Sequence, residues 1–284
     1  MRQIPGFRGL TLLFAWVGLT AAGCSTVPPL PAAARDLNEA GVRALAAGEL
    51  SDAEAQLSLA TEYSPSFTEA WANLGMLELS RGNLNMAQKH LENALDLNEH
   101  LPAPHHGLGL IAERRDKVDV AIKHYRDALQ VDPGFVASRV NLANLLFRGK
   151  KYELAREEFH KLVLHRPKEA AGWLGYVETL LRLGRAGEAE RALEQASSKV
   201  GAHPELALLR ARRMIAHGDL ANAEATLDAL CTADDPSLAS RAFAFAAVVH
   251  MTRGDRGRAK AALNEALVRD PKSAVALQLA TQVR

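Results

Sequence analysis

The chain has 284 residues, enough for one or two compact domains, and 48% of them are hydrophobic, so a sizeable interior can be buried. Aromatic residues make up only 5%, and the apolar residues are mostly alanine and leucine, a composition that favours close-packed helices over sheets. Lysine and arginine total 34 against 33 for aspartate and glutamate, so no large field of one sign would attract nucleic acid, and a DNA or RNA partner is not expected.

The first 23 residues have the organisation of a secretory signal. Arg2 and Arg8 precede an apolar run over residues 10–22, and small residues follow at its end. The run holds roughly a dozen apolar residues, whereas a spanning helix needs about 20. The sequence Ala-Ala-Gly-Cys at 21–24 resembles the lipobox of bacterial lipoproteins, in which cleavage leaves the cysteine as a lipidated first residue. We therefore predict a lipoprotein signal peptide over 1–23 and lipidation, palmitate included, at Cys24; an ordinary cleaved signal and an uncleaved anchor remain the alternatives.

The lipobox resemblance also implies a location. One acyl chain holds a protein to a membrane only marginally, but the three chains of a bacterial lipoprotein would hold firmly. Ser25 follows the cysteine where an inner-membrane retention signal commonly has aspartate, so we expect anchoring in the outer membrane, facing the periplasm. The proline-rich residues 24–33 are interpreted as a short, stiff tether between the lipid and the fold.

The remainder of the chain repeats with a period of 34 residues. Repeats at 34–67, 68–101, 102–135, 136–169, 170–203, 204–239 and 240–271 bring an alanine into register seven times. This first column is Ala53, Ala87, Ala121, Ala155, Ala189, Ala223 and Ala259. A second column lies four positions later, and it holds a large apolar residue in every repeat: Leu57, Leu91, Tyr125, Phe159, Leu193, Leu227 and Leu263. Two columns in step predict helices that pack by the same rule in each repeat.

Turn residues divide each repeat into two helices. A left-handed residue ends the first helix, and glycine takes that conformation without a steric cost, at Gly48, Gly82, Gly184, Gly218 and Gly254. Asp116 and Lys150 stand at this place in the third and fourth repeats. Proline stops the second helix at Pro65, Pro133, Pro167 and Pro271. The two extra residues of the sixth repeat fall in an expected loop over 231–237, and Arg210 stands in that repeat where a leucine is expected.

A 34-residue helical hairpin with this order of residues resembles the tetratricopeptide repeat, and Trp71-Ala72-Asn73-Leu74-Gly75 is its clearest opening. The resemblance covers residues 34–271. It implies an all-α fold, a right-handed α-α solenoid of seven hairpins, and residues 272–284 are expected to form a capping helix over the last of them.

No catalytic motif stands out, so we expect a protein that is not an enzyme and has no small-molecule substrate or cofactor. His105 and His106 are adjacent on a helix and point about 100° apart, and no carboxylate or cysteine follows at a ligand spacing. We therefore expect no metal site, and His105, which takes the place of the usual tryptophan, is interpreted as packing. Cys231 falls at a leucine position, so a buried apolar role is expected.

The resemblance implies that the first helix of each repeat lines a concave groove that binds other polypeptides. Two parallel stripes of residues predict a mostly apolar floor with polar groups at its centre. The predicted lining is Val42, Leu45, Met76, Leu79, Leu110, Asn144, Phe147, Leu181 and Ile215. An amphipathic helix or an extended apolar segment fits such a floor.

Four further groove residues are predicted to make polar contacts with a ligand. Asn73 and Asn141 stand where related peptide binders hold a ligand backbone with asparagine, although asparagine is also simply frequent at that place in the family. Arg148 and Arg182 are expected either to pair with acidic groups flanking the bound segment or to stay solvated. The lysine and asparagine set of the chaperone-tail clamp is absent, so an acidic C-terminal tail is not the expected ligand.

A lipid anchor joined to such a solenoid resembles the pilotins of type IV and Flp/Tad pilus secretins. The resemblance implies a non-enzymatic scaffold that assists assembly of an envelope machine such as a secretin. The alternative is a periplasmic adaptor that docks cell-wall hydrolases or polysaccharide-export components.

Overall fold

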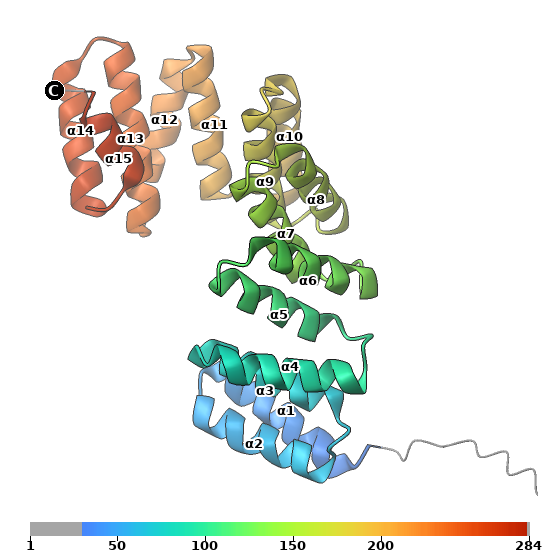
Figure 1. Cartoon of the computed structure of the whole chain (residues 1–284). Helices are drawn as coiled ribbons and strands as arrows, with labels where there is room; N and C mark the ends of the chain where they lie inside the picture. The colour runs from blue at the N-terminus through green and yellow to red at the C-terminus, as the bar shows by residue number, and fades with distance from the viewer. Residues whose placement is uncertain (1–29, 283–284) are drawn as a thin grey trace, which may run out of the picture.

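A computed structural model describes residues 30–282 of the chain, and all regular structure in that range is helical (Figure 1). The predicted signal peptide and Cys24 lie outside the described residues. Seven antiparallel hairpins follow one another and a short helix ends the array, so the predicted all-α solenoid is confirmed. The helices are α1 (Ala32–Ala47), α2 (Leu50–Tyr63), α3 (Thr68–Arg81), α4 (Leu84–Leu97), α5 (Pro102–Arg114), α6 (Val118–Val131), α7 (Val136–Arg148), α8 (Tyr152–His165), α9 (Ala170–Arg182), α10 (Ala186–Val200), α11 (Pro204–His217), α12 (Leu220–Cys231), α13 (Pro236–Thr252), α14 (Arg256–Arg269) and α15 (Ala274–Ala280).

The two sequence columns form the core of every hairpin. All seven alanines of the first column are 0% exposed, and no residue of the second column exceeds 3%. Glycine on the first helix lets the two helices approach closely, because an added Cβ at Gly75 would lie 2.5 Å from Leu91 Cγ and one at Gly109 would lie 2.5 Å from Tyr125 Cε1. Small residues on one helix and large ones on its partner therefore set the spacing within each hairpin.

The turns between the paired helices take the left-handed conformation that the sequence predicts. Gly48, Gly82, Gly184, Gly218 and Gly254 have φ between 73° and 84°. Asp116 and Lys150 adopt it without being glycine, with φ of 57° and 58°. Gly149 precedes Lys150 with φ of −73°, so the hairpin geometry, and not the residue type, decides which position is left-handed.

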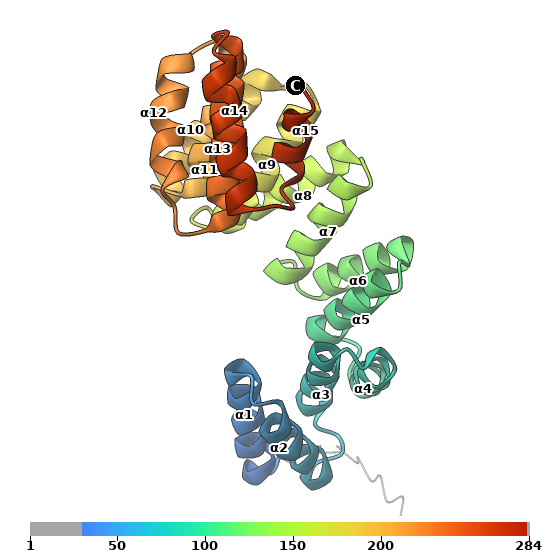
Figure 2. The same ribbon diagram turned by 90° about the vertical axis from the view of Figure 1, so that its left-hand side faces the viewer.

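The first helices form the inner side of the array. Neighbouring first helices contact each other directly, as α1 does with α3, α3 with α5, α7 with α9, α9 with α11 and α11 with α13, whereas successive second helices make no comparable contact in the described part. Figures 1 and 2 show the hairpins stacked in chain order into an extended, curved array with α1 at one end and α15 at the other. The odd-numbered helices up to α13 therefore offer the concave surface.

Three expected boundaries are corrected by the structure. Helix α1 begins at Ala32, so the last two residues of the predicted tether are already helical. Helix α13 begins at Pro236, four residues before the predicted start of the seventh repeat at 240. The expected loop over 231–237 is consequently only residues 232–235. Proline is well suited to the first turn of a helix, and the Asp235 carboxylate accepts a hydrogen bond from the Ser237 amide at 2.9 Å, so this segment starts a helix instead of prolonging the loop.

Among residues 30–282, no helix is long and apolar enough to cross a membrane.

Candidate functional site

The predicted apolar floor of the groove is largely used for packing between repeats. Leu79 is only 3% exposed and packs with Leu91 and Leu108, so its prediction as a ligand-binding residue is corrected to a core role. The other large residues of the floor are half-buried between neighbouring first helices: Leu45, Met76, Leu110, Phe147, Leu181 and Ile215. Val42, at 41% exposed, and Asn144 remain open to solvent. Adjacent repeats must bury apolar area against each other, and these side chains supply it.

Both predicted asparagines are engaged within the protein. The Asn73 amide donates to Asn38 Oδ1 of the preceding first helix at 2.8 Å. Asn141 lies beside the Tyr125 hydroxyl, and its side chain lowers the pKa of that hydroxyl. Holding a ligand backbone would require each amide to exchange its present contact.

A polar network lies at the centre of the concave face. The Tyr125 hydroxyl donates to Glu113 Oε2 at 2.5 Å, and Arg148 of the next repeat donates to Oε1 of the same carboxylate. Burial raises the pKa of Tyr125 far above its usual value, and the contact with Glu113 raises it further while Asn141 opposes the shift. Tyr125 therefore stays neutral and donates the hydrogen bond that orients the Glu113 carboxylate. The carboxylate in turn orients the Arg148 guanidinium.

A second carboxylate repeats this arrangement two repeats further on. Glu178 accepts from Arg182 Nε at 3.2 Å and from Arg212 Nη1 of the following repeat at 3.1 Å. The Arg212 guanidinium also lies over the ring of Phe245, 5.3 Å from its centroid. These contacts join α9, α11 and α13 across the groove.

The groove carries a row of positively charged residues, of which the sequence predicts two. Arg114, Arg148 and Arg182 recur at intervals of 34 residues at the ends of α5, α7 and α9, and we call these three the arginine row. All three are exposed; the Arg148 and Arg182 side chains retain 63% and 55% of their accessible area despite their ion pairs. The sequence prediction does not include Arg114, although the same register identifies it. With Arg212, the row sets four cations against the carboxylates of Glu113 and Glu178.

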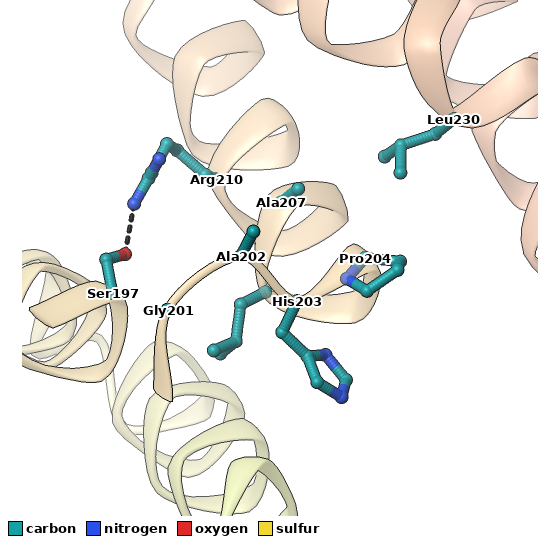
Figure 3. Close-up of a pocket in the computed structure, with 9 residues that line it drawn as sticks. Ser197, Gly201, Ala202, His203, Pro204, Ala207, Arg210 and Leu230 are labelled. Atoms are coloured by element: carbon teal, nitrogen blue, oxygen red, sulfur yellow. Dashed lines mark hydrogen bonds between the residues drawn. The ribbon is translucent and has the colours of Figure 1, made fainter. Parts of the chain in front are cut away.

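An opening lies between the fifth and sixth repeats. Arg210 stands where other repeats bury Leu74, Leu108 and Leu142, and a guanidinium does not enter an apolar core unpaired. It turns outward and donates to Ser197 of α10 (Figure 3). A hollow of about 540 Å³ is left, lined by Ser197, Gly201, Ala202, His203, Pro204, Leu206, Ala207, Arg210 and Leu230. One charged residue at a leucine position thus loosens the junction between these two repeats.

Cys231 behaves as the sequence predicts. Its side chain is 8% exposed and packs with Leu227 and Leu230 at the end of α12. Burial raises the pKa of the thiol to about 11, so it remains protonated at neutral pH.

Tetratricopeptide repeat models match residues 38–98, 114–174 and 150–213, which together make up more than half of the chain. The chain is a tetratricopeptide repeat protein. Members of this family bind other proteins or peptides, and their repeats are generally non-catalytic. No curated protein sequence matches the chain.

Several solved structures share the fold of this tetratricopeptide repeat protein. A tetratricopeptide repeat protein from Parabacteroides merdae is 19% identical, with a TM-score of 0.61 over 88% of this chain and 98% of its own. PilF of Pseudomonas aeruginosa is also 19% identical, with a TM-score of 0.60 over 76% of this chain and 97% of its own. YrrB, described as having an unusual peptide-binding site, is 18% identical, with a TM-score of 0.50 over 67% of this chain and 97% of its own. At such identities the likeness is one of fold.

Proposed function

We propose that this protein is a lipid-anchored scaffold of the bacterial outer membrane that binds a segment of a partner protein along its concave surface. The lipobox-like residues 21–24 support the anchor, and the arginine row supports the binding surface. The ligand that suits the groove is an amphipathic or extended apolar segment flanked by carboxylates. Its apolar side chains meet the half-buried floor, and its acids pair with guanidiniums that are already oriented by Glu113 and Glu178.

The first candidate for the partner is a secretin subunit of a type IV or Flp/Tad pilus. The combination of lipid anchor and solenoid supports it, and the fold shared with PilF over nearly all of that chain agrees with it. Docking of cell-wall hydrolases or polysaccharide-export components is the alternative. Deleting the gene separates the two, since loss of secretin multimers from the envelope supports the first and intact multimers reject it.

The binding surface is tested by capture from membranes with the mature protein as bait. Replacing Arg114, Arg148 and Arg182 together by alanine should weaken capture of the partner more than tenfold, because charge-assisted hydrogen bonds contribute about 1.5–3 kcal/mol each. The matched control replaces three exposed cations of second helices, Lys89, Arg126 and Arg191, and should leave capture unchanged. Equal losses in the two triple variants would place the partner elsewhere, and circular dichroism checks that both remain helical.

The anchor is tested separately at Cys24. A Cys24→Ala variant should lose incorporation of an alkyne-labelled fatty acid and leave the membrane fraction. Continued labelling, or membrane association that does not depend on the cysteine, would reject the proposed lipidation.

A further inference from the structure

The third repeat brings two histidines and an aspartate together between the two helices of its hairpin. His105 lies on α5, and His124 and Asp127 lie one turn apart on α6. One ligand atom from each residue lies within 4.8 Å of the other two. The imidazole rings are 6.2 Å apart between centroids, with 32° between their planes. From this geometry we propose that His105, His124 and Asp127 bind a divalent transition-metal ion of the zinc class.

The donor set selects this class of ion. Two imidazole nitrogens and one carboxylate oxygen are the ligands of three-residue zinc sites, which keep a fourth position for water. Calcium and magnesium prefer oxygen ligands alone, so two histidines argue against them. Ligand atoms of a tetrahedral zinc ion lie about 3.3 Å apart, so metal binding would shorten the distances between these ligand atoms, now within 4.8 Å, by up to about 1.5 Å.

His105 lacks the hydrogen bond that residues at its position make in neighbouring repeats. At the equivalent place Trp71 donates its indole N–H to the Pro65 carbonyl at 2.8 Å, and Trp173 donates to the Pro167 carbonyl at the same distance. Arg139 makes the corresponding bond to Pro133 in the fourth repeat. Among the described residues His105 has no corresponding bond, and its Nδ1 is buried without a hydrogen-bond partner.

His124 also has a ring nitrogen without a hydrogen-bond partner among the described residues. Its Nδ1 is also buried without a partner in the described part of the chain. An unpaired buried nitrogen costs free energy, and a metal ion bound through these two nitrogens would remove that cost.

Two charged neighbours modulate the site. Lys123 Nζ pairs with Asp127 Oδ2 at 2.8 Å, but that ammonium is on a side chain 72% exposed, and the carboxylate retains a second oxygen. Glu92 of the preceding repeat adds negative charge near His124. The adjacent His106 takes no part, because its Nδ1 contacts Ser138 Oγ at 3.0 Å between α5 and α7.

Along α5 the sequence offers no carboxylate or cysteine at a ligand spacing from His105, and it therefore predicts no metal site there. The hairpin instead supplies ligands from α6, since positions 19 and 22 residues further along the chain face His105 across the two helices. The proposal therefore reverses that expectation.

The test is a titration of the mature chain, purified in detergent without a histidine tag, with zinc and with cobalt. We expect one equivalent to bind at micromolar metal, cobalt to give the strong visible absorption of a four-coordinate ion, and the thermal midpoint to rise with metal. His105→Trp removes a ligand while installing the residue that Trp71 and Trp173 provide in other repeats, so folding is preserved. It and Asp127→Asn should each weaken binding about tenfold or more.

His90→Ala is the matched control. His90 occupies the position of His124 one repeat earlier, where its ring stacks on Trp71 with centroids 5.5 Å apart, and no second histidine faces it. This variant should bind metal as the parent does. Absence of one-equivalent binding overturns the proposal, as does binding that survives both His105→Trp and Asp127→Asn or that is lost in His90→Ala.

Discussion

A buried ion pair in the fourth repeat offers a sharp test of how this solenoid tolerates charge. Arg139 stands at the tryptophan position of α7 and pairs with Glu158 of α8 at 2.8 Å, with the two side chains only 8% and 14% exposed. Arg139 also donates to the Pro133 carbonyl, and Glu158 accepts from the half-exposed Lys161 at 2.7 Å. Replacing Glu158 by alanine leaves a buried guanidinium without its carboxylate.

The magnitude follows from the burial of the pair. Removing one partner of a buried ion pair costs about 3–5 kcal/mol, and the remaining bond to Pro133 and the partial exposure of Glu158 favour the lower end, about 3 kcal/mol. The fifth repeat provides the rescue, because Trp173 and Ala192 occupy the same two positions there, at 5% and 2% exposed. A double variant, Arg139→Trp with Glu158→Ala, should therefore recover most of the loss.

Urea unfolding and amide hydrogen exchange measure the effect. A solenoid is stabilised by a sum of repeat and neighbour terms, so protection in α7 and α8 should fall first and most in Glu158→Ala. A loss below about 1 kcal/mol, or a double variant less stable than the single one, would refute the assignment of this pair as a buried, mutually dependent unit.

Three further predictions concern turns, the thiol and acid stability. Lys150→Gly should stabilise the protein by about 0.5–1 kcal/mol, because a left-handed lysine is strained, whereas Gly184→Ala should destabilise it by about as much in the same urea series. Cys231 should react with a thiol reagent at pH 8 only on unfolding, since its pKa is raised to about 11; fast reaction in the native protein would contradict its burial. Burial lowers the pKa of His90, His106 and His124 below the ordinary 6.5. The unfolded state therefore binds more protons than the folded state, and the free energy of unfolding should fall as the pH drops below about 6.5. His106→Gln should flatten that pH dependence of the urea midpoint, and an unchanged slope would count against the assignment.

Within the described residues, the sequence by itself determined the hairpins. Columns such as Ala53 with Leu57 repeat because the same packing problem recurs in every repeat, and local turn residues such as Gly48 place the break between helices. It also identified Cys231 as buried and Arg210 as a misfit at a leucine position. These are properties of one position and its register, which a single sequence displays.

The tertiary structure decided which of the aligned residues remain available to a ligand. Leu79 and Val42 lie in neighbouring stripes of the same groove, yet only the stacking of successive first helices buries Leu79 and leaves Val42 exposed. The pairing of Arg148 with Glu113, and the meeting of His105 with His124 across a hairpin, likewise depend on side chains from different helices. The 34-residue period specifies the position of each residue on its helix. Contacts between side chains of different helices depend on packing, which the period does not encode.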